Sequence, residues 1–162
     1  LAYPEVCFLL AEIYQRGWGT GNAQEWYEKG VRSSIEKWYT FGATTHPDWA
    51  NPPAMPDDAA IDAFLQHPKI AYDDANGLTL IHTQRWLDLM LQPQEAWHLS
   101  RRSGLIPMLT VQNGVSGADE PAPRRLRYPE DERNNNLSNY EAQVSKMSGG
   151  DELSSRVWWD VN

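Results

Sequence analysis

Cysteine is almost missing from this 162-residue sequence, since Cys7 is the only one. A single thiol excludes an intrachain disulfide, and the apolar run 6–10 around it favours a small buried side chain. Cys7 follows Pro-Glu-Val, without the small residues that precede a lipidation site. Apolar runs are also short, and none reaches the roughly 20 residues that span a bilayer. We therefore expect any signal peptide or lipid anchor to lie outside this chain.

Basic residues are outnumbered, with 14 Lys and Arg against 22 Asp and Glu, which gives a formal net charge of −8. A field of this sign repels nucleic-acid phosphates and anionic lipid headgroups, but it does not repel neutral sugars. The only local basic cluster is Arg124, Arg125 and Arg127, and the acidic residues 130–132 follow it directly. We interpret this segment as a salt-bridged turn, and the sequence predicts no nucleic-acid partner.

Phenylalanine is scarce, at three residues, whereas the sequence has eight Trp and seven Tyr. Most aromatic rings therefore carry a polar group, which suits half-exposed helix edges, interfaces and ligand platforms. Apolar residues make up 41% of the chain and charged residues 22%, which is a globular composition. The length fits one ordinary domain with a core.

Apolar residues recur at helical spacing in the first 38 positions. Pro4 suits a first helical turn, and Gly17 ends the pattern. Asn22 and Glu25 then form the signature of a capping box at the start of a second helix. We therefore expect a helical hairpin over 4–38, which is the repeating unit of TPR-like arrays.

The remaining segments alternate between helix and loop signals. We expect a loop over 39–57, helices over 58–104, and a loop-rich C-terminal segment over 105–162 with a last helix near 137–147. Within the second of these segments, the buried residues are predicted to be Leu80, Ile81, Leu87 and Leu91. The predicted fold class is mainly α, with TPR-like helical hairpins, long loops and little β, in one domain over 1–162.

Residues for catalysis or metal binding form no convincing pattern. No pair of carboxylates stands out as poised for glycoside cleavage, and the four histidines show no metal-binding spacing. The segment 73–77 lacks the alternating ligands and closing glutamate of a calcium loop, so a turn is the better interpretation. No serine lies in a nucleophile elbow. We expect a binding protein, with no metal, no cofactor and no enzymatic activity.

Aromatic residues in predicted loops are the candidate ligand contacts, namely Trp49, Trp18, Tyr39 and Phe41. A flat ring covers the apolar face of a sugar while polar neighbours bond its hydroxyls. At ~25 cal/mol per Å² of shared area, one stack contributes only about 1–2 kcal/mol, so two or three platforms are needed. Trp18 fits equally well beneath the hairpin turn. Trp49, in its Pro- and Asn-rich setting, is the better candidate.

Six short sequence words occur in order between residues 3 and 160. They are E-V-C-F-L-L-A-E at 5–12 with R-G-W at 16–18, Y-E-K-G-V-R-S-S at 27–34, I-H-T-Q-R-W-L at 81–87, E-A-W at 95–97 with R-R-S-G at 101–104, P-R-R-L-R-Y-P at 123–129 with Glu132, Asn135, Asn139 and Tyr140, and R-V-W-W-D at 156–160. Singly each word is a weak signal, but six in order are a strong one. The chain resembles the C-terminal part of a SusD/RagB-family nutrient-binding lipoprotein.

This resemblance implies an α-helical, TPR-like fold on a surface-exposed lipoprotein of the outer membrane of Bacteroidetes. It implies binding of an oligosaccharide such as a starch-like glycan, or sometimes a peptide, and delivery to a SusC-type TonB-dependent transporter. It also implies that the lipid anchor and several further helices belong to an N-terminal portion outside this chain. Membrane association would then occur only through that anchor.

The shared words also have a structural explanation, because a helical core with bidentate arginine bonds requires such residues. The residues concerned are Gln84, Arg85, Trp86, Trp97, Arg101 and Arg102. The words therefore indicate the scaffold, and the resemblance implies that ligand contacts lie in variable loops. Two other functions stay open: a TPR-like protein-interaction module that binds no glycan, and a glycoside hydrolase.

Overall fold

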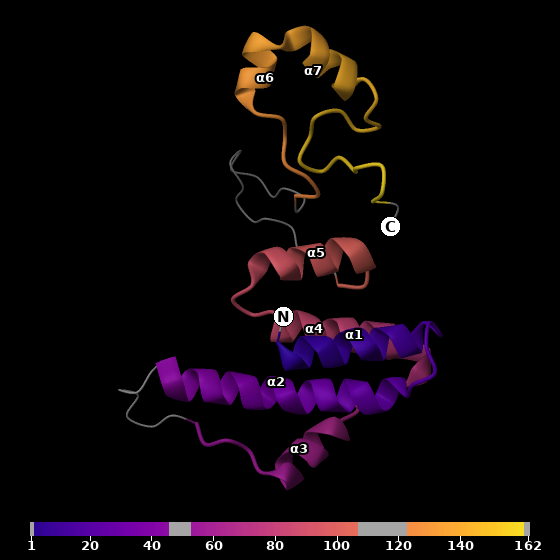
Figure 1. Cartoon of the computed structure of the whole chain (residues 1–162), viewed down its shortest axis with the longest axis vertical. Coiled ribbons are helices and arrows are strands. Elements are labelled where there is room, and N and C mark those ends of the chain that lie inside the picture. The colour runs from indigo at the N-terminus through magenta and orange to yellow at the C-terminus, as the bar shows by residue number, and fades with distance from the viewer. Residues whose placement is uncertain (1, 46–52, 107–122, 161–162) are drawn as a thin grey trace. The chain divides into compact units, whose positions relative to one another are not determined.

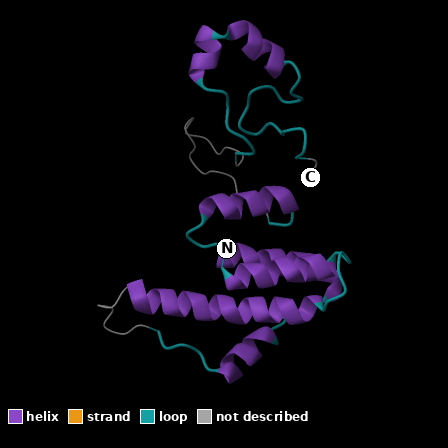
Figure 2. Ribbon diagram, in the orientation of Figure 1, coloured by secondary structure: helices purple, strands orange, loops and turns teal. Residues whose placement is uncertain are grey.

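A computed structural model of the chain describes residues 2–45, 53–106 and 123–160 (Figure 1). The chain divides into two compact units, Leu1–Leu99 and Ser100–Asn162. The described residues form helices joined by loops and contain no strand (Figure 2). The prediction of a mainly α fold with little β is confirmed for this part of the chain.

The first unit opens with an antiparallel hairpin of α1 (Tyr3–Gln15) and α2 (Ala23–Thr45). Pro4 lies in the first turn of α1, and Gly17 follows the helix with a φ of 70°, which glycine adopts without strain. The backbone N–H of Glu25 donates to Oδ1 of Asn22 at 3.1 Å, so the predicted cap is confirmed. The short turn between α1 and α2, and with it their antiparallel packing, therefore arises from local signals in the sequence.

The second helix is longer than the sequence predicts, since α2 continues through Thr45. The prediction of a loop beginning at residue 39 is therefore wrong. Trp38 and Phe41 are three residues apart on the helix and pack edge to face with ring centroids 5.6 Å apart. The hydroxyl of Thr45 donates to the carbonyl of Phe41 at 2.7 Å. The ring contact between Trp38 and Phe41 supports the helix through residues whose intrinsic propensity favours a loop.

The apolar core of the first unit lies between the hairpin, α3 (Asp58–Leu65) and α4 (Gly77–Asp88). Its buried members are Phe8, Ala11, Tyr27, Val31, Ile61, Leu65 and Ile81. Figure 1 shows α1 and α4 side by side, and the two helices are in contact. At Gly30, an added Cβ would lie 2.6 Å from Cε1 of Phe8, so the close approach of α1 and α2 requires glycine there.

Charged residues also join α1 to α4 inside the first unit. Arg85 lies 3.1 Å from Oε1 of Glu5 and 4.0 Å from Oε2 of Glu12. His82, which is fully buried, places Nε2 3.2 Å from Oε2 of Glu12. This network explains why Glu5, Glu12 and Arg85 belong to the shared sequence words, because each pairs with a charge on the other helix.

The end of α4 contradicts the predicted burial of two leucines. Leu87 is 51% exposed and Leu91 is 70% exposed, whereas Leu89 is buried beside the core. Successive side chains of a helix are rotated by about 100° around its axis. Leu89, eight residues after Ile81, therefore lies nearer to the buried face than Leu87, which is six residues after it. Leu91 also has a φ of 69°, because the chain reverses there after the helix.

The helix α5 (Pro93–Ser103) begins in the first unit and ends in the second, where Gly104 follows it with a φ of 63°. The second unit then contains α6 (Glu130–Asn135) and α7 (Leu137–Val144), so two short helices replace the single helix predicted near 137–147. Among the described residues of this unit, most buried side chains are polar or charged. They are Ser100, Arg101, Asp151, Ser155 and Asp160.

The predicted salt-bridged turn exists, but its carboxylates come from a different part of the sequence. Arg124 donates to both carboxylate oxygens of Asp160 at 2.9 Å, and Arg125 lies 3.0 Å from Asp151. Arg127 pairs with Glu152. The prediction that residues 130–132 pair with the arginines is therefore wrong, because those residues enter α6 and the C-terminal segment folds back onto the arginines instead.

Candidate ligand-binding site

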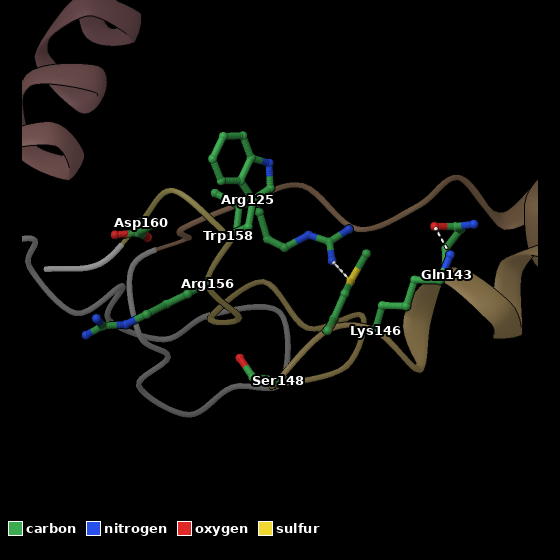
Figure 3. A pocket seen from close by; sticks show the side chains of 9 residues that line it. Arg125, Gln143, Lys146, Ser148, Arg156, Trp158 and Asp160 are labelled. Carbon is green, nitrogen blue, oxygen red and sulfur yellow. Dashed lines mark hydrogen bonds between the residues drawn. The ribbon is translucent and has the colours of Figure 1, made fainter.

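A cavity of about 510 Å³ lies in the second unit, between the end of α7 and the C-terminal segment (Figure 3). Its volume falls in the range of small-molecule binding sites, roughly 300–1,000 Å³. The residues that line it are Arg125, Gln143, Lys146, Met147, Ser148, Arg156, Val157, Trp158 and Asp160. One large aromatic ring and several hydrogen-bonding side chains therefore share this space.

Two adjacent tryptophans in the C-terminal segment have different roles. Trp159 lies against the guanidinium of Arg101, whose Cζ is 4.6 Å from the ring centroid, and this contact holds the segment in the unit. Trp158 is 91% exposed and lines the cavity. Because Trp158 makes so little contact with the protein, its indole face is open to a ligand.

Hydrogen-bonding groups around Trp158 come from two segments. Gln143 and Lys146 come from α7 and the turn after it, and Nζ of Lys146 donates to Oε1 of Gln143 at 3.4 Å. Arg156 comes from the same segment as Trp158, and Figure 3 shows the two side chains pointing in different directions. An amide, an ammonium and a guanidinium beside an indole provide both donors and an acceptor for hydroxyl groups.

The floor of the cavity is held by ion pairs that are already satisfied. Both carboxylate oxygens of Asp160, which is buried, accept from Arg124, and Arg101 lies 3.8 Å from the same carboxylate. Arg125 pairs with Asp151 and also contacts the sulfur of Met147. These bonds fix the two loops relative to each other, so the cavity walls are positioned before any ligand binds.

A second and more open cavity, of about 480 Å³, lies in the first unit between the start of α1 and the later turns of α2. Tyr3 and Phe41 line it, together with the hydroxyl-bearing residues Ser33, Thr40 and Thr44. The lysine that lines this groove, Lys37, pairs with buried Asp88 at 2.5 Å, whereas Lys146 of the first cavity has no such ion pair among the described residues. This groove is the location of one aromatic residue that the sequence singled out, Phe41.

The four predicted aromatic contacts do not form one site. Trp18 is 71% exposed in the hairpin turn, with the guanidinium of Arg16 5.2 Å from its ring centroid. Phe41 lies at the opposite end of the hairpin, beside the start of α1. Tyr39 is half-buried on α2, and Trp49 lies outside the described residues. The open position of Trp18 disagrees with packing beneath the turn.

The residue that sequence reasoning missed is Trp158. The sequence words assigned it to the scaffold, since it occurs in R-V-W-W-D at the end of the resemblance. The one available signal is that two large aromatic residues are adjacent in a segment without helical or strand periodicity. The sequence does not say which of the two is exposed.

The described residues also bear on metal binding. No group of three or more His, Cys, Asp or Glu side chains in these ranges is arranged to hold a metal ion. The segment at 73–77 forms a short 3-10 turn, η1 (Asp74–Asn76), with Asp73 accepting from the backbone of Ala75, so the predicted turn is confirmed. Within 2–45, 53–106 and 123–160, no helix combines the length and apolar character needed to cross a membrane.

The sequence matches the family described as "Susd and RagB outer membrane lipoprotein" over residues 1–160. The chain belongs to the SusD/RagB family. The predicted resemblance, which ran from residue 3 to residue 160, is thereby confirmed. Among curated proteins, none matches the sequence.

Several solved structures share the fold of this chain. A chitin-binding protein is 34% identical with a TM-score of 0.75, over 99% of this chain and 33% of its own. A SusD-like protein of Bacteroidetes AC2a is 30% identical with a TM-score of 0.78, over 100% and 30%. A SusD homologue of Bacteroides fragilis is 28% identical with a TM-score of 0.71, over 98% and 34%. The chain spans about a third of the length of these relatives.

Proposed function

We propose that this chain is part of a nutrient-binding lipoprotein of the outer-membrane surface that captures an oligosaccharide without cleaving it. The observation that carries this proposal is the cavity beside Trp158, where an open indole face adjoins hydrogen-bonding side chains. That combination matches the two kinds of surface on a sugar ring, an apolar face of C–H groups and a rim of hydroxyls. The chitin-binding relative supports a saccharide ligand.

Delivery to a SusC-type TonB-dependent transporter completes the proposed function. Membership of an outer-membrane lipoprotein family supports a position at the cell surface. A binding protein in that position serves uptake only if a transporter receives its ligand. Co-purification from outer membranes with a TonB-dependent transporter tests this part of the proposal, and recovery of the native protein without any transporter contradicts it.

Isothermal titration calorimetry against a panel of oligosaccharides tests ligand binding. The panel contains chito-oligosaccharides, malto-oligosaccharides and uronate-containing oligosaccharides, with short peptides as the alternative nutrient. Trp158→Ala is expected to lower the affinity for the bound sugar about tenfold, since one aromatic stack contributes about 1–2 kcal/mol. Its thermal stability is expected to stay unchanged, because the side chain makes few contacts with the protein.

Trp18→Ala is the matched control, because it removes a similarly exposed indole from the first unit. Retained affinity in this variant, with weakened affinity in Trp158→Ala, supports the cavity as the site. The opposite result places the ligand at the hairpin turn. Absence of binding across all sugars supports a protein-interaction module instead, and release of reducing ends from any glycan contradicts the non-enzymatic assignment.

A further inference from the structure

The charges around the Trp158 cavity are not balanced. Three lining residues are cationic, namely Arg125, Lys146 and Arg156, and a single lining residue, Asp160, is anionic. The chain as a whole has a formal net charge of −8. The cavity is therefore a local reversal of the overall charge, and such reversals raise the local concentration of ligands of the opposite sign.

Two of the four lining charges are already neutralised by the protein. Asp160 accepts from Arg124 through both carboxylate oxygens at 2.9 Å, and Arg125 pairs with Asp151 at 3.0 Å. Each of these pairs is buried on at least one side, so neither partner is available to a ligand without breaking a bond inside the unit.

The other two charges have no carboxylate partner among the described residues. Lys146 makes a long hydrogen bond to the amide of Gln143 and no ion pair. Arg156 is exposed and makes neither a hydrogen bond nor an ion pair with these residues. One ammonium and one guanidinium therefore remain available beside the open face of Trp158. Figure 3 shows them on different sides of the cavity.

We infer that the Trp158 cavity selects acidic oligosaccharides, in which sugar units carry carboxylates. This inference rests on the proposed function and specifies its ligand class. The indole covers the apolar face of a sugar ring, as it would for any glycan, while Lys146 and Arg156 pair with carboxylates on the ligand. Their separation around the cavity fits an oligomer that offers a carboxylate on more than one unit.

A matched pair of ligands isolates the contribution of charge. Oligogalacturonides and the same oligosaccharides with methyl-esterified carboxyls have the same rings, linkages and length, but only the first carries negative charge. Binding of both to the 162-residue chain is measured by calorimetry at low and at physiological salt. The acidic form is expected to bind about three- to tenfold more tightly at low salt, the size expected for exposed charge pairs. Added salt should reduce that difference.

Charge-removing variants locate the effect. Lys146→Gln and Arg156→Gln should each weaken binding of the acidic form about threefold, as one exposed pair predicts, and weaken binding of the ester less, because glutamine keeps a hydrogen-bond donor but carries no charge. Lys69→Gln is the matched control, because Lys69 is an exposed lysine of the first unit, outside the cavity. It changes the net charge by the same amount and should leave both affinities unchanged.

The outcomes separate this inference from the proposed function. Equal affinity for the acid and the ester, with loss of both in Trp158→Ala, overturns the acidic specificity and leaves oligosaccharide binding in place. An equal effect of Lys69→Gln also overturns it, because the preference would then come from net charge rather than from the cavity. Failure to bind either form or any other oligosaccharide overturns both proposals.

Discussion

The two units of this chain are stabilised by different interactions. In the first unit, helices pack through an apolar core in which Phe8, Tyr27 and Ile81 are fully buried. Among the described residues of the second unit, the buried side chains are mainly polar. Asp151 pairs with Arg125 and Arg133, and Asp160 pairs with Arg124. One unit is held mainly by apolar burial and the other mainly by directed ion pairs.

This difference explains why the proposed ligand site lies in the second unit. An apolar core covers its aromatic rings, since burial of a ring is the interaction that stabilises it. Ion pairs fix a loop through a few atoms and leave neighbouring side chains uncovered. Trp159 contributes to the fold through Arg101, whereas Trp158, one residue earlier, stays open. A loop-rich unit held by arginines can therefore be rigid and still present an aromatic face.

The largest expected effect is removal of the central ring of the first unit. Phe8→Ala should lower the free energy of unfolding by about 3–5 kcal/mol, because it leaves a cavity in a fully packed core. Hydrogen exchange should show lost protection in α1 and α2, with an effect that does not depend on salt. Salt-dependent destabilisation would contradict an apolar origin for the stability of this unit.

A smaller effect is expected from breaking the ion pairs of the second unit. Asp160→Asn removes the carboxylate that binds Arg124 through both oxygens, and it should cost about 2–3 kcal/mol, less than a fully buried pair because Arg124 partly reaches solvent. Exchange protection should fall in 123–160. Glu130→Gln is the control, since this exposed residue makes none of these bonds, and an equal loss in it would contradict the assignment.

The contact between α1 and α2 offers a third test. Gly30→Ala places a methyl group 2.6 Å from the ring of Phe8, which should cost about 1–3 kcal/mol by overpacking. Helix propensity opposes this by ~1 kcal/mol, so a net loss of about 1 kcal/mol is expected from chemical denaturation. Gly42→Ala is the control, because an added Cβ there meets no atom within 4 Å and should stabilise α2 slightly.

The smallest effect concerns alkaline pH. Burial, with a contribution from the charge of Asp74, raises the pKa of Tyr72 from 10.0 to about 12. Burial also raises the pKa of Tyr27, whose hydroxyl donates to the carbonyl of Ile70 at 2.7 Å. The folded state thus favours the neutral phenols, so the contribution of Tyr72 to stability is complete below pH 10 and is lost as pH rises through about 12.

Urea unfolding across that pH window checks this expectation. The free energy of unfolding should fall steadily above pH 10 in the native sequence and less steeply in Tyr72→Phe, which has no phenol to ionise. Tyr39→Phe is the control, because this half-buried ring lies on α2 outside the core cluster. An identical slope in native protein and Tyr72→Phe would contradict a contribution from Tyr72.

Much of the first unit could be predicted because its signals are local. The proline, the asparagine cap and the glycine that define the hairpin act within a few residues of their own positions. The length of α2 could not be predicted in the same way. Residues 39–45 have weak helix propensity, and side-chain contacts such as that between Trp38 and Phe41 outweigh it.

The sequence by itself determined the family and the helical class, because these depend on short words and on spacing. It did not determine which residues of those words pack inside, since Trp86, predicted for the helical core, is 42% exposed. Only the tertiary structure decided which carboxylates the arginines bind and which tryptophan of the pair at 158–159 faces outward. The reason is distance along the chain: Arg124 and Asp160 are 36 residues apart. No local rule specifies such a partner.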